Sequence, residues 1–299
     1  MYDAIIIGAG PAGLTSAIYL LRANKKVLVL DAKGYGGQIT DAHKVENYPA
    51  IQSISGLDFA INLYNQAKNL GAEIKFEEVK EIKNDKTVVT NGGEYNAKTV
   101  IIATGAAKRK LNIDKEEKLT GKGISYCATC DGSFYKNKTV AVVGGGNTAL
   151  EDAVYLSDLA SKVYLIHRSY EFEGEEKYTD ELKTKNNVEF VLNSNIVKLN
   201  GEDKLKSVTV ENGSGNKREI NTDGLFIAIG HEPKNEIFAN VVDLSPTGYI
   251  KCNNSVYTKS EGIYAAGDTR VKDLRQLTTA VSDGSLAATA AIKEMKGIN

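Results

Sequence analysis

The chain has 299 residues, enough for two domains of about 150 residues each, and its 42% hydrophobic and 25% charged residues are typical of a globular protein. The net charge of −1 argues against a nucleic-acid binder driven by counterion release, and no apolar run approaches the roughly 18 residues of a membrane span. The N-terminus lacks the cationic leader of a signal peptide, and three cysteines without a secretion signal do not indicate a disulfide scaffold, so we expect a cytoplasmic protein.

The N-terminal segment predicts a strand, a glycine turn, a helix and a second strand. Residues 4–7 are apolar and precede a complete G-x-G-x-x-G at residues 8–13. A helix is expected over residues 14–23 and a strand over residues 27–30, which ends at Asp31. The glycines let the backbone approach a pyrophosphate at the helix N-terminus, and the acid can accept a hydrogen bond from a ribose hydroxyl.

Two cysteines and an acid follow in the middle of the chain, in the run Cys127-Ala-Thr-Cys130-Asp131. Cysteines at this spacing can close a small, reducible disulfide, and an adjacent acid can carry a proton to and from a leaving thiolate. The alternative for Asp131 is a turn or cap residue. Zinc would need further ligands, and neither Cys252 nor the three histidines stand at metal spacing, so we expect no metal and a bystander role for Cys252.

The strand, turn and helix pattern then occurs a second time. Residues 140–143 read as a buried strand, residues 144–149 as G-x-G-x-x-A, residues 150–159 as a helix and residues 163–166 as a strand that ends at His167. One such glycine turn is weak evidence for a dinucleotide site. Two copies with matched spacing predict two doubly wound α/β domains, one for each dinucleotide.

Three further strand ends and a helix complete the expected architecture. Strands are expected over residues 99–105, which end in Thr104 and Gly105, over residues 225–230, and over residues 262–268, which end in Gly267 and Asp268. A last helix spans about residues 277–295. We therefore expect two Rossmann-like, three-layer α/β domains, the second inserted into the first. The first domain is expected to comprise residues 1–113 and 244–299, and the second residues 114–243.

These motifs together resemble the low-molecular-weight, bacterial-type thioredoxin reductases. The likeness runs nearly end to end and includes the runs at residues 36–39, 46–49, 103–106, 267–268 and 275–277. It implies that the split domain binds FAD and that the inserted, NAD(P)-binding-like domain carries the redox pair. The implied cofactor-binding residues are Gly8, Gly10, Pro11, Ala12, Gly13, Asp31, Gly37, Gln38, Asn47, Thr104, Gly105, Gly267, Asp268, Arg275, Gln276 and Leu277.

The resemblance also implies a mechanism. The Cys127–Cys130 disulfide would receive electrons from reduced FAD, with Cys130 nearer the flavin and Cys127 attacking the disulfide of thioredoxin. Asp131 would act as acid and base. The family is homodimeric and moves its inserted domain, so both properties are expected here.

The sequence departs from the family where NADPH is recognised. The family has His-Arg-Arg and a further arginine four residues on, which hold the 2′-phosphate. Here Ser169 and Glu173 stand at two of these positions, although the chain is rich in lysine, with 31 Lys and 6 Arg. A carboxylate about 4 Å from a phosphate charge costs on the order of several kcal/mol at an effective dielectric constant near 20.

Three electron donors remain open. The sequence looks like the ferredoxin-dependent flavin thioredoxin reductases, which lack the basic motif, so reduced ferredoxin is the favoured donor and NADPH is doubtful. NADH would tolerate Glu173, and weak NADPH use would follow if a residue such as Lys177 replaced the missing arginines. A non-catalytic flavin-binding redox sensor is the alternative to an enzyme.

Overall fold

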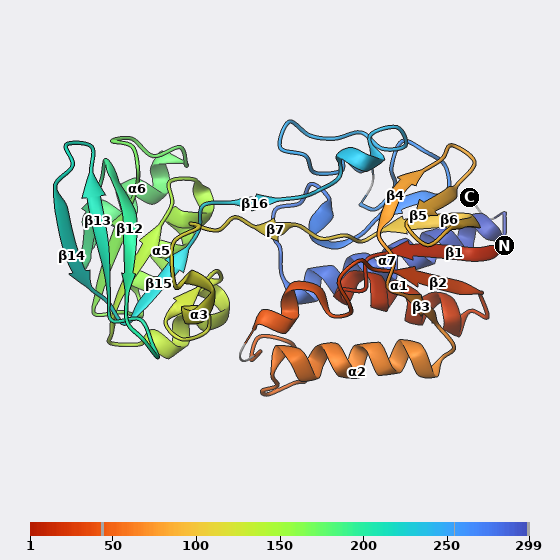
Figure 1. Ribbon diagram of the computed structural model, residues 1–299, viewed down its shortest axis with the longest axis horizontal. Coiled ribbons are helices and arrows are strands. Elements are labelled where there is room, and N and C mark those ends of the chain that lie inside the picture. The colour runs from red at the N-terminus through yellow and green to blue at the C-terminus, as the bar shows by residue number, and fades with distance from the viewer. Residues whose placement is uncertain (43–44, 254, 298–299) are drawn as a thin grey trace. The chain divides into compact units, whose positions relative to one another are not determined.

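The computed structural model describes residues 1–42, 45–253 and 255–297, and its chain forms two compact units (Figure 1). Unit 1 comprises residues 1–107 and 232–299, and unit 2 comprises residues 108–231, so unit 2 is inserted into unit 1. The two crossing segments, β7 (Ala107–Lys108) and β16 (His231–Glu232), pair with each other. Both structural boundaries lie earlier in the chain than the expected ones, at 113/114 and 243/244.

Unit 1 is built on a seven-stranded sheet with the order β3-β2-β1-β6-β5-β4, in which β17 also pairs with β6. Strands β3, β2, β1, β6 and β17 run parallel, whereas β4 and β5 continue the sheet antiparallel. The expected strand at residues 27–30 is observed with those bounds. The strands are β1 (Tyr2–Ile7), β2 (Val27–Leu30), β3 (Glu73–Lys75), β4 (Val79–Ile82), β5 (Thr87–Thr90), β6 (Glu94–Ile102) and β17 (Ile263–Ala265).

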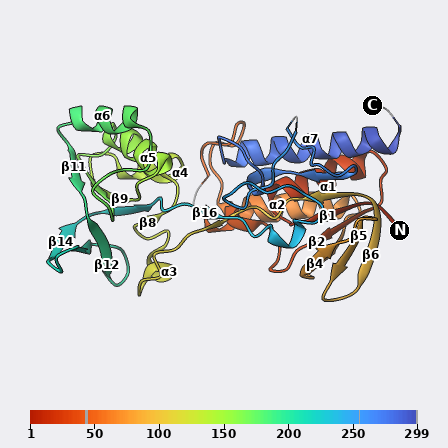
Figure 2. The ribbon, with the colours of Figure 1, turned by 90° about the horizontal axis from the view of Figure 1, so that it is seen from above.

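The central strands of this sheet are apolar on both faces because both faces are covered. Ile6 contributes to a core shared with two helices that lie side by side, α1 and α7 (Figure 2), and Ile5 contributes to the core on the opposite face. The expected C-terminal helix has the bounds of α7, whereas α1 begins earlier than expected, at Pro11, because proline is favoured in a first helical turn. The helices are α1 (Pro11–Arg22), α2 (Gly56–Asn69) and α7 (Leu277–Met295), with short 3₁₀ turns η1 (Gly37–Asp41), η3 (Glu236–Phe238) and η4 (Gly267–Thr269).

Unit 2 contains a parallel five-stranded sheet with the order β11-β10-β9-β15-β8. Val140 and Val142 pack with the helices on one face, and Ala141 and Val143 pack with a three-stranded antiparallel sheet on the other. The parallel strands are β8 (Ile124–Ser125), β9 (Thr139–Val143), β10 (Lys162–Ile166), β11 (Val188–Val191) and β15 (Gly224–Ile227). The antiparallel strands are β12 (Ser194–Asn200), β13 (Ser207–Asn212) and β14 (Lys217–Asn221).

Two helices of unit 2 contain or follow the two functional motifs expected there. Helix α4 holds the second cysteine, and α5 begins at the second glycine turn. The helices are α3 (Glu116–Leu119), α4 (Ala128–Asp131), α5 (Asn147–Ser157) and α6 (Glu176–Thr184), with the 3₁₀ turn η2 (Gly132–Tyr135). Across the described residues, no helix combines the length and the apolar character that a membrane span requires.

Candidate functional site

The first glycine turn joins β1 to α1 in a conformation that side chains would disrupt. Gly8 has a φ of +112°, and a Cβ placed there would collide with the carbonyl oxygen of Ala103. A Cβ at Gly13 would collide with the carbonyl oxygen of Gly8. Helix α1 begins after Gly10, has no acidic residue in its first turn and has no side-chain cap from the residues that the structure describes. Its N-terminal amides and positive dipole end therefore suit an anionic group.

Asp31 fastens this turn to the end of β2. Its Oδ2 accepts a hydrogen bond from the amide of Ala9 at 2.8 Å, and its Oδ1 accepts from the amides of Lys33 and Gly34 at 2.8 and 3.2 Å. A carboxylate has about four lone-pair positions, so these bonds leave capacity for a ribose hydroxyl. The structure therefore adds a structural tie to the expected binding role.

Adjacent parallel strands bring the other expected residues to the same edge of the sheet. Thr104 and Gly105 follow β6, and Gly267 and Asp268 follow β17, its neighbour. The Thr104 hydroxyl is 2.9 Å from that of Thr269 in the turn after β17. Ligands of open α/β sheets bind at the carboxyl ends of the strands, which is where these residues lie.

The buried carboxylate of Asp268 is the clearest indication that a polar group binds at this edge of the sheet. Its Oδ1 is buried and has no hydrogen-bond partner in the described part of the chain. Burial raises the pKa of the Asp268 carboxyl above its ordinary value, despite the opposing effect of Lys272. A buried unpaired oxygen is costly, and a donor hydroxyl such as those of a ribityl chain would satisfy it. Together with the anion-suited end of α1, this oxygen fits the expected FAD.

Replacing Asp268 with alanine is expected to weaken FAD binding by about 10- to 100-fold, because a hydrogen bond to a charged group contributes about 1.5–3 kcal/mol. Titration of the apoprotein with FAD, followed by flavin fluorescence, measures the effect. The exposed Asp273 in the next loop supplies the matched control, since Asp273→Ala removes a carboxylate in water. Equal FAD affinity of the two variants would remove Asp268 from the site.

The remaining expected cofactor residues also lie in unit 1. Gln38 donates to the carbonyl oxygen of Ala106, and Asn47 Nδ2 donates to Gln276 Oε1 at 3.2 Å. Gln276 caps α7, of which Leu277 is the first residue. The Arg275 guanidinium lies 4.2 Å from the ring centre of Tyr249, and its buried Nε makes no hydrogen bond to the described residues. Gly37, with a φ of +61°, precedes Gln38, and Pro11 and Ala12 form the first turn of α1.

The two motif cysteines are joined as a disulfide, with Cα atoms 5.3 Å apart. Cys127 lies at the N-cap of α4, and Cys130 and Asp131 lie within that helix. Both cysteines are half-buried. The Asp131 carboxylate accepts a hydrogen bond from the hydroxyl of Ser125 at 2.6 Å. A reducible bond and an adjacent carboxylate are therefore present in one short segment.

The third cysteine lies outside this segment. Cys252 is a free thiol in unit 1, and burial raises its pKa to about 11. A thiol with that pKa stays protonated near neutral pH and is a poor nucleophile.

The second glycine turn is intact but carries an unusual neighbour. Gly144 has a φ of +150°, and Gly146 precedes α5, which has no side-chain cap among the described residues. A Cβ at Gly145 would collide with the ring of His167, so the imidazole lies directly against the turn. Burial lowers the pKa of His167, which leaves it neutral at pH 7.

The loop that contains Glu171 and Glu173 is hydrogen-bonded to this turn. The amides of Glu173 and Gly174 donate to the carbonyl oxygen of Gly145 at 2.8 and 3.1 Å. Glu173 Oε1 lies 3.4 Å from the guanidinium of Arg168, and both side chains are exposed. An exposed pair of this kind contributes little to stability. It nevertheless places a negative charge beside Arg168, which is the one arginine of the family's basic motif that this chain keeps. Lys177 is itself paired with Glu175 at 2.7 Å.

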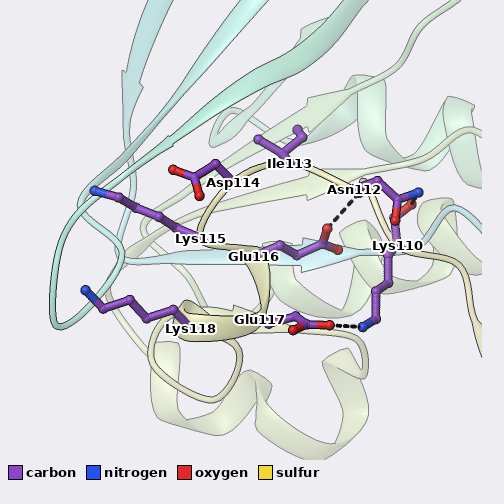
Figure 3. A pocket seen from close by; sticks show the side chains of 8 residues that line it. All are labelled: Lys110, Asn112, Ile113, Asp114, Lys115, Glu116, Glu117 and Lys118. Carbon is purple, nitrogen blue, oxygen red and sulfur yellow. Dashed lines mark hydrogen bonds and ion pairs between the residues drawn. The ribbon is translucent and has the colours of Figure 1, made fainter.

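A shallow hollow on unit 2 is lined by Lys110 and residues 112–118 (Figure 3). Lys110 pairs with Glu117, and the buried Glu116 accepts from the amides of Leu111 and Asn112 at 2.9 and 2.8 Å. Glu116 also accepts from the hydroxyl of Tyr126 at 2.6 Å. These contacts hold the loop that precedes the cysteine pair, so we assign this hollow a structural role.

Several residues that shape the two sites have no motif in the sequence. Asn235 is fully buried and donates to the carbonyl oxygens of Gly248 and Thr269, which holds the turn after β17. Asp283 accepts from the amide of Gly267 at 3.0 Å and from the side chains of Arg270 and Lys272. Although burial acts to raise it, these hydrogen bonds hold the pKa of Asp283 below its ordinary value. Ser125, which binds Asp131, also belongs to this group. It is the one of these residues that the sequence could have indicated, because it lies two residues before Cys127.

Comparisons with known proteins agree with this geometry. A family model described as pyridine nucleotide-disulphide oxidoreductase matches residues 2–284. A Clostridium pasteurianum protein described as a 34.2 kDa protein in a rubredoxin operon is 43% identical over 99% of this chain and 97% of its own length. The thioredoxin reductase of Bacillus subtilis is 42% identical, covering 96% of this chain and 93% of that protein. The crystal structure of thioredoxin reductase from Streptococcus pyogenes superposes with a TM-score of 0.94 at 37% identity, covering 100% of this chain and 99% of that one.

Proposed function

Because the chain belongs to the pyridine nucleotide-disulphide oxidoreductase family, as a low-molecular-weight, bacterial-type thioredoxin reductase, we propose that it reduces thioredoxin with electrons from a reduced iron–sulfur protein, ferredoxin, and not from NADPH. The chain is thus a flavoprotein disulfide reductase, and the electron donor is the point that our proposal adds. The non-catalytic sensor is disfavoured by a cysteine pair that stands beside a carboxylate.

We assign FAD to unit 1 and the redox pair to unit 2. Gly8–Gly13 and Asp31 would hold the pyrophosphate and a ribose, Asp268 the ribityl chain, and Gln276 and Leu277 the ring edge. When bound, FAD supplies the link between a one-electron donor and the two-electron reduction of a disulfide. We further propose a homodimer, as in the family, and a cytoplasmic location, where thiols are kept reduced.

The chain's own residues carry the steps on thioredoxin. Reduction breaks the Cys127–Cys130 bond, and the Cys127 thiolate attacks the thioredoxin disulfide to form a mixed disulfide. Asp131, which takes up the proton of the Cys127 thiol when the nucleophilic thiolate forms, gives that proton to the thioredoxin thiolate that is released. The Cys130 thiolate then attacks the Cys127 sulfur, which restores the Cys127–Cys130 bond and frees the second thioredoxin sulfur. This second sulfur takes a proton from solvent, so that thioredoxin leaves as the dithiol and the enzyme returns to the disulfide.

The donor proposal rests on the Arg168–Glu173 pair. A 2′-phosphate needs cationic, preferably bidentate donors, and here the guanidinium of Arg168 already faces a carboxylate. Burial lowers the pKa of His167, and Glu175 offsets the charge of Lys177 at 2.7 Å, so neither supplies the net positive charge of the missing arginines. The Clostridium pasteurianum relative is named for a rubredoxin operon, which associates that relative with another redox protein.

An NAD(P)H-dependent thioredoxin reductase is the second candidate. The intact Gly144–Gly146 turn and the uncapped start of α5 favour it, because they suit a pyrophosphate. The same turn also packs a helix onto a strand, which gives it a structural reason to persist.

Anaerobic titration of the holoenzyme separates the donors. Reduced ferredoxin is expected to bleach the flavin absorption band and to support turnover of thioredoxin. NADPH at micromolar concentration is expected to leave the band unchanged, because the nucleotide site lacks the charge that holds a 2′-phosphate. NADH is expected to leave it unchanged because His167 and Arg168, and not an acid that binds the ribose hydroxyls, follow the second strand of this motif. Rapid bleaching by micromolar NADPH or NADH, without turnover on ferredoxin, would refute the proposed donor and establish the second candidate.

A further inference from the structure

Ser125 occupies the position between the sheet of unit 2 and the redox segment. It is the last residue of β8, is 4% exposed, and pairs in register with Phe226 of β15. Its hydroxyl oxygen lies 3.1 Å from the amide nitrogen of Cys127 and 2.6 Å from Oδ2 of Asp131. One hydroxyl therefore contacts both the nucleophile's backbone and the carboxylate.

The direction of these hydrogen bonds follows from the distances. A serine hydroxyl has one proton, and its two acceptors here are Asp131 Oδ2 at 2.6 Å and the carbonyl oxygen of Cys127 at 3.3 Å. Hydroxyl-to-carboxylate bonds are the shorter and stronger class, at about 2.5–2.7 Å. Ser125 therefore donates to Asp131, and its lone pair accepts the amide of Cys127.

This arrangement holds both the backbone and the side chain of Asp131. Its amide donates to the carbonyl oxygen of Cys127 at 3.1 Å, and its Oδ2 is held by Ser125. Its Oδ1 makes no hydrogen bond to the residues that the structure describes, and stays available for proton exchange. The sheet thus sets the position of the carboxylate relative to Cys127.

We propose that Ser125 is a positioning residue for the proton transfer by Asp131, acting through the Ser125 hydroxyl that joins Asp131 Oδ2 to the Cys127 amide. This inference rests on the proposed function, in which Asp131 protonates the thiolate released from thioredoxin. Ser125 neither accepts nor donates a proton to thioredoxin. It keeps the carboxylate in the orientation in which the donated proton reaches the released sulfur.

Loss of this hydroxyl is not expected to unfold the segment, because a second anchor holds it. The residue between Ser125 and Cys127, Tyr126, donates its hydroxyl to the buried Glu116 at 2.6 Å. Strand β8 also keeps its backbone pairing with β15. The variant Ser125→Ala is therefore suitable for kinetic work.

A double-mutant cycle tests the proposal. Holoenzyme reduced anaerobically with stoichiometric dithionite is mixed with oxidised thioredoxin, and the release of thioredoxin thiols is timed by quenching with a thiol reagent. Asp131→Asn is expected to slow this step by about 10²- to 10⁴-fold, the usual contribution of a general acid. Ser125→Ala is expected to slow it by about 10-fold or more, and the double variant no further than Asp131→Asn alone, since coupled residues are not additive.

The control is Ser157→Ala, which removes another buried serine hydroxyl of unit 2, one that donates to the carbonyl oxygen of Val154 at 2.7 Å. It is expected to react at the wild-type rate, and every variant should take up electrons at both flavin and disulfide. A wild-type rate for Ser125→Ala, or losses that multiply in the double variant, would overturn the role of Ser125. Failure of the wild-type enzyme to reduce thioredoxin would instead overturn the proposed function.

Discussion

Replacing Cys130 with serine is expected to abolish the reduction of thioredoxin, by about 10³-fold or more in kcat/KM. The reason is chemical: the reduced Cys127 and Cys130 pair gives up two electrons to thioredoxin as the Cys127–Cys130 bond forms again, and a serine oxygen cannot form that bond. Cys127→Ser is expected to have the same result, because it removes the nucleophile. Thiol release from thioredoxin under anaerobic conditions measures both variants.

Cys252→Ser provides the control for this prediction. It also removes a thiol, but from a half-buried position in unit 1 whose raised pKa keeps it unreactive. Its activity and flavin content are expected to match the wild type. Residual thioredoxin reduction by Cys130→Ser would contradict the mechanism, whereas loss of activity in Cys252→Ser would reveal a role for the third cysteine.

The double variant Ser169→Arg/Glu173→Arg is expected to bind NADPH on the order of 10²-fold or more tightly than the wild type. Two arginines would restore charge-assisted bonds worth about 1.5–3 kcal/mol each to the 2′-phosphate. The change also frees Arg168, which Glu173 faces at 3.4 Å in this chain. Calorimetric titration with NADPH and bleaching of the flavin by NADPH measure the gain.

Two comparisons make this prediction specific. NADH lacks the 2′-phosphate, so its affinity is expected to change little between the wild type and the double variant. Glu171→Arg alters the charge of the same exposed loop at a position outside the family's basic motif, and is expected to gain little, since solvent screens exposed charges. An equal gain for NADH, or for Glu171→Arg, would show that general charge and not the 2′-phosphate is being recognised.

The functional features that were predictable from the sequence are local ones. Each glycine turn lies between a strand and a helix within about 30 residues, and the φ values of Gly8 and Gly144 explain why glycine is needed there. The Cys127–Cys130 disulfide joins residues three apart, so its closure depends on one helical turn. The missing arginines at positions 169 and 173 were likewise visible as residue types at fixed spacing.

The features that were not predictable depend on residues far apart in the chain. The antiparallel sheet of β12, β13 and β14 on one face of unit 2 was not anticipated, and the contact of Asp283 with Arg270 requires α7 to pack on its own sheet. Asn235 holds the turn after β17 from a segment that follows unit 2 in the chain. Nothing in the residue types of these positions distinguishes them from ordinary surface residues.

The sequence by itself therefore determined the α/β class, the two dinucleotide turns, the redox pair and the departure from the NADPH motif, because each is encoded by spacing within a short segment. Only the tertiary structure decided which charges face one another. It pairs Glu173 with Arg168, leaves Asp268 Oδ1 buried and unpaired, and joins Ser125 to Asp131. The physical reason is that burial and hydrogen bonding depend on what the fold brings within about 3 Å of an atom, and that is a property of the packed chain.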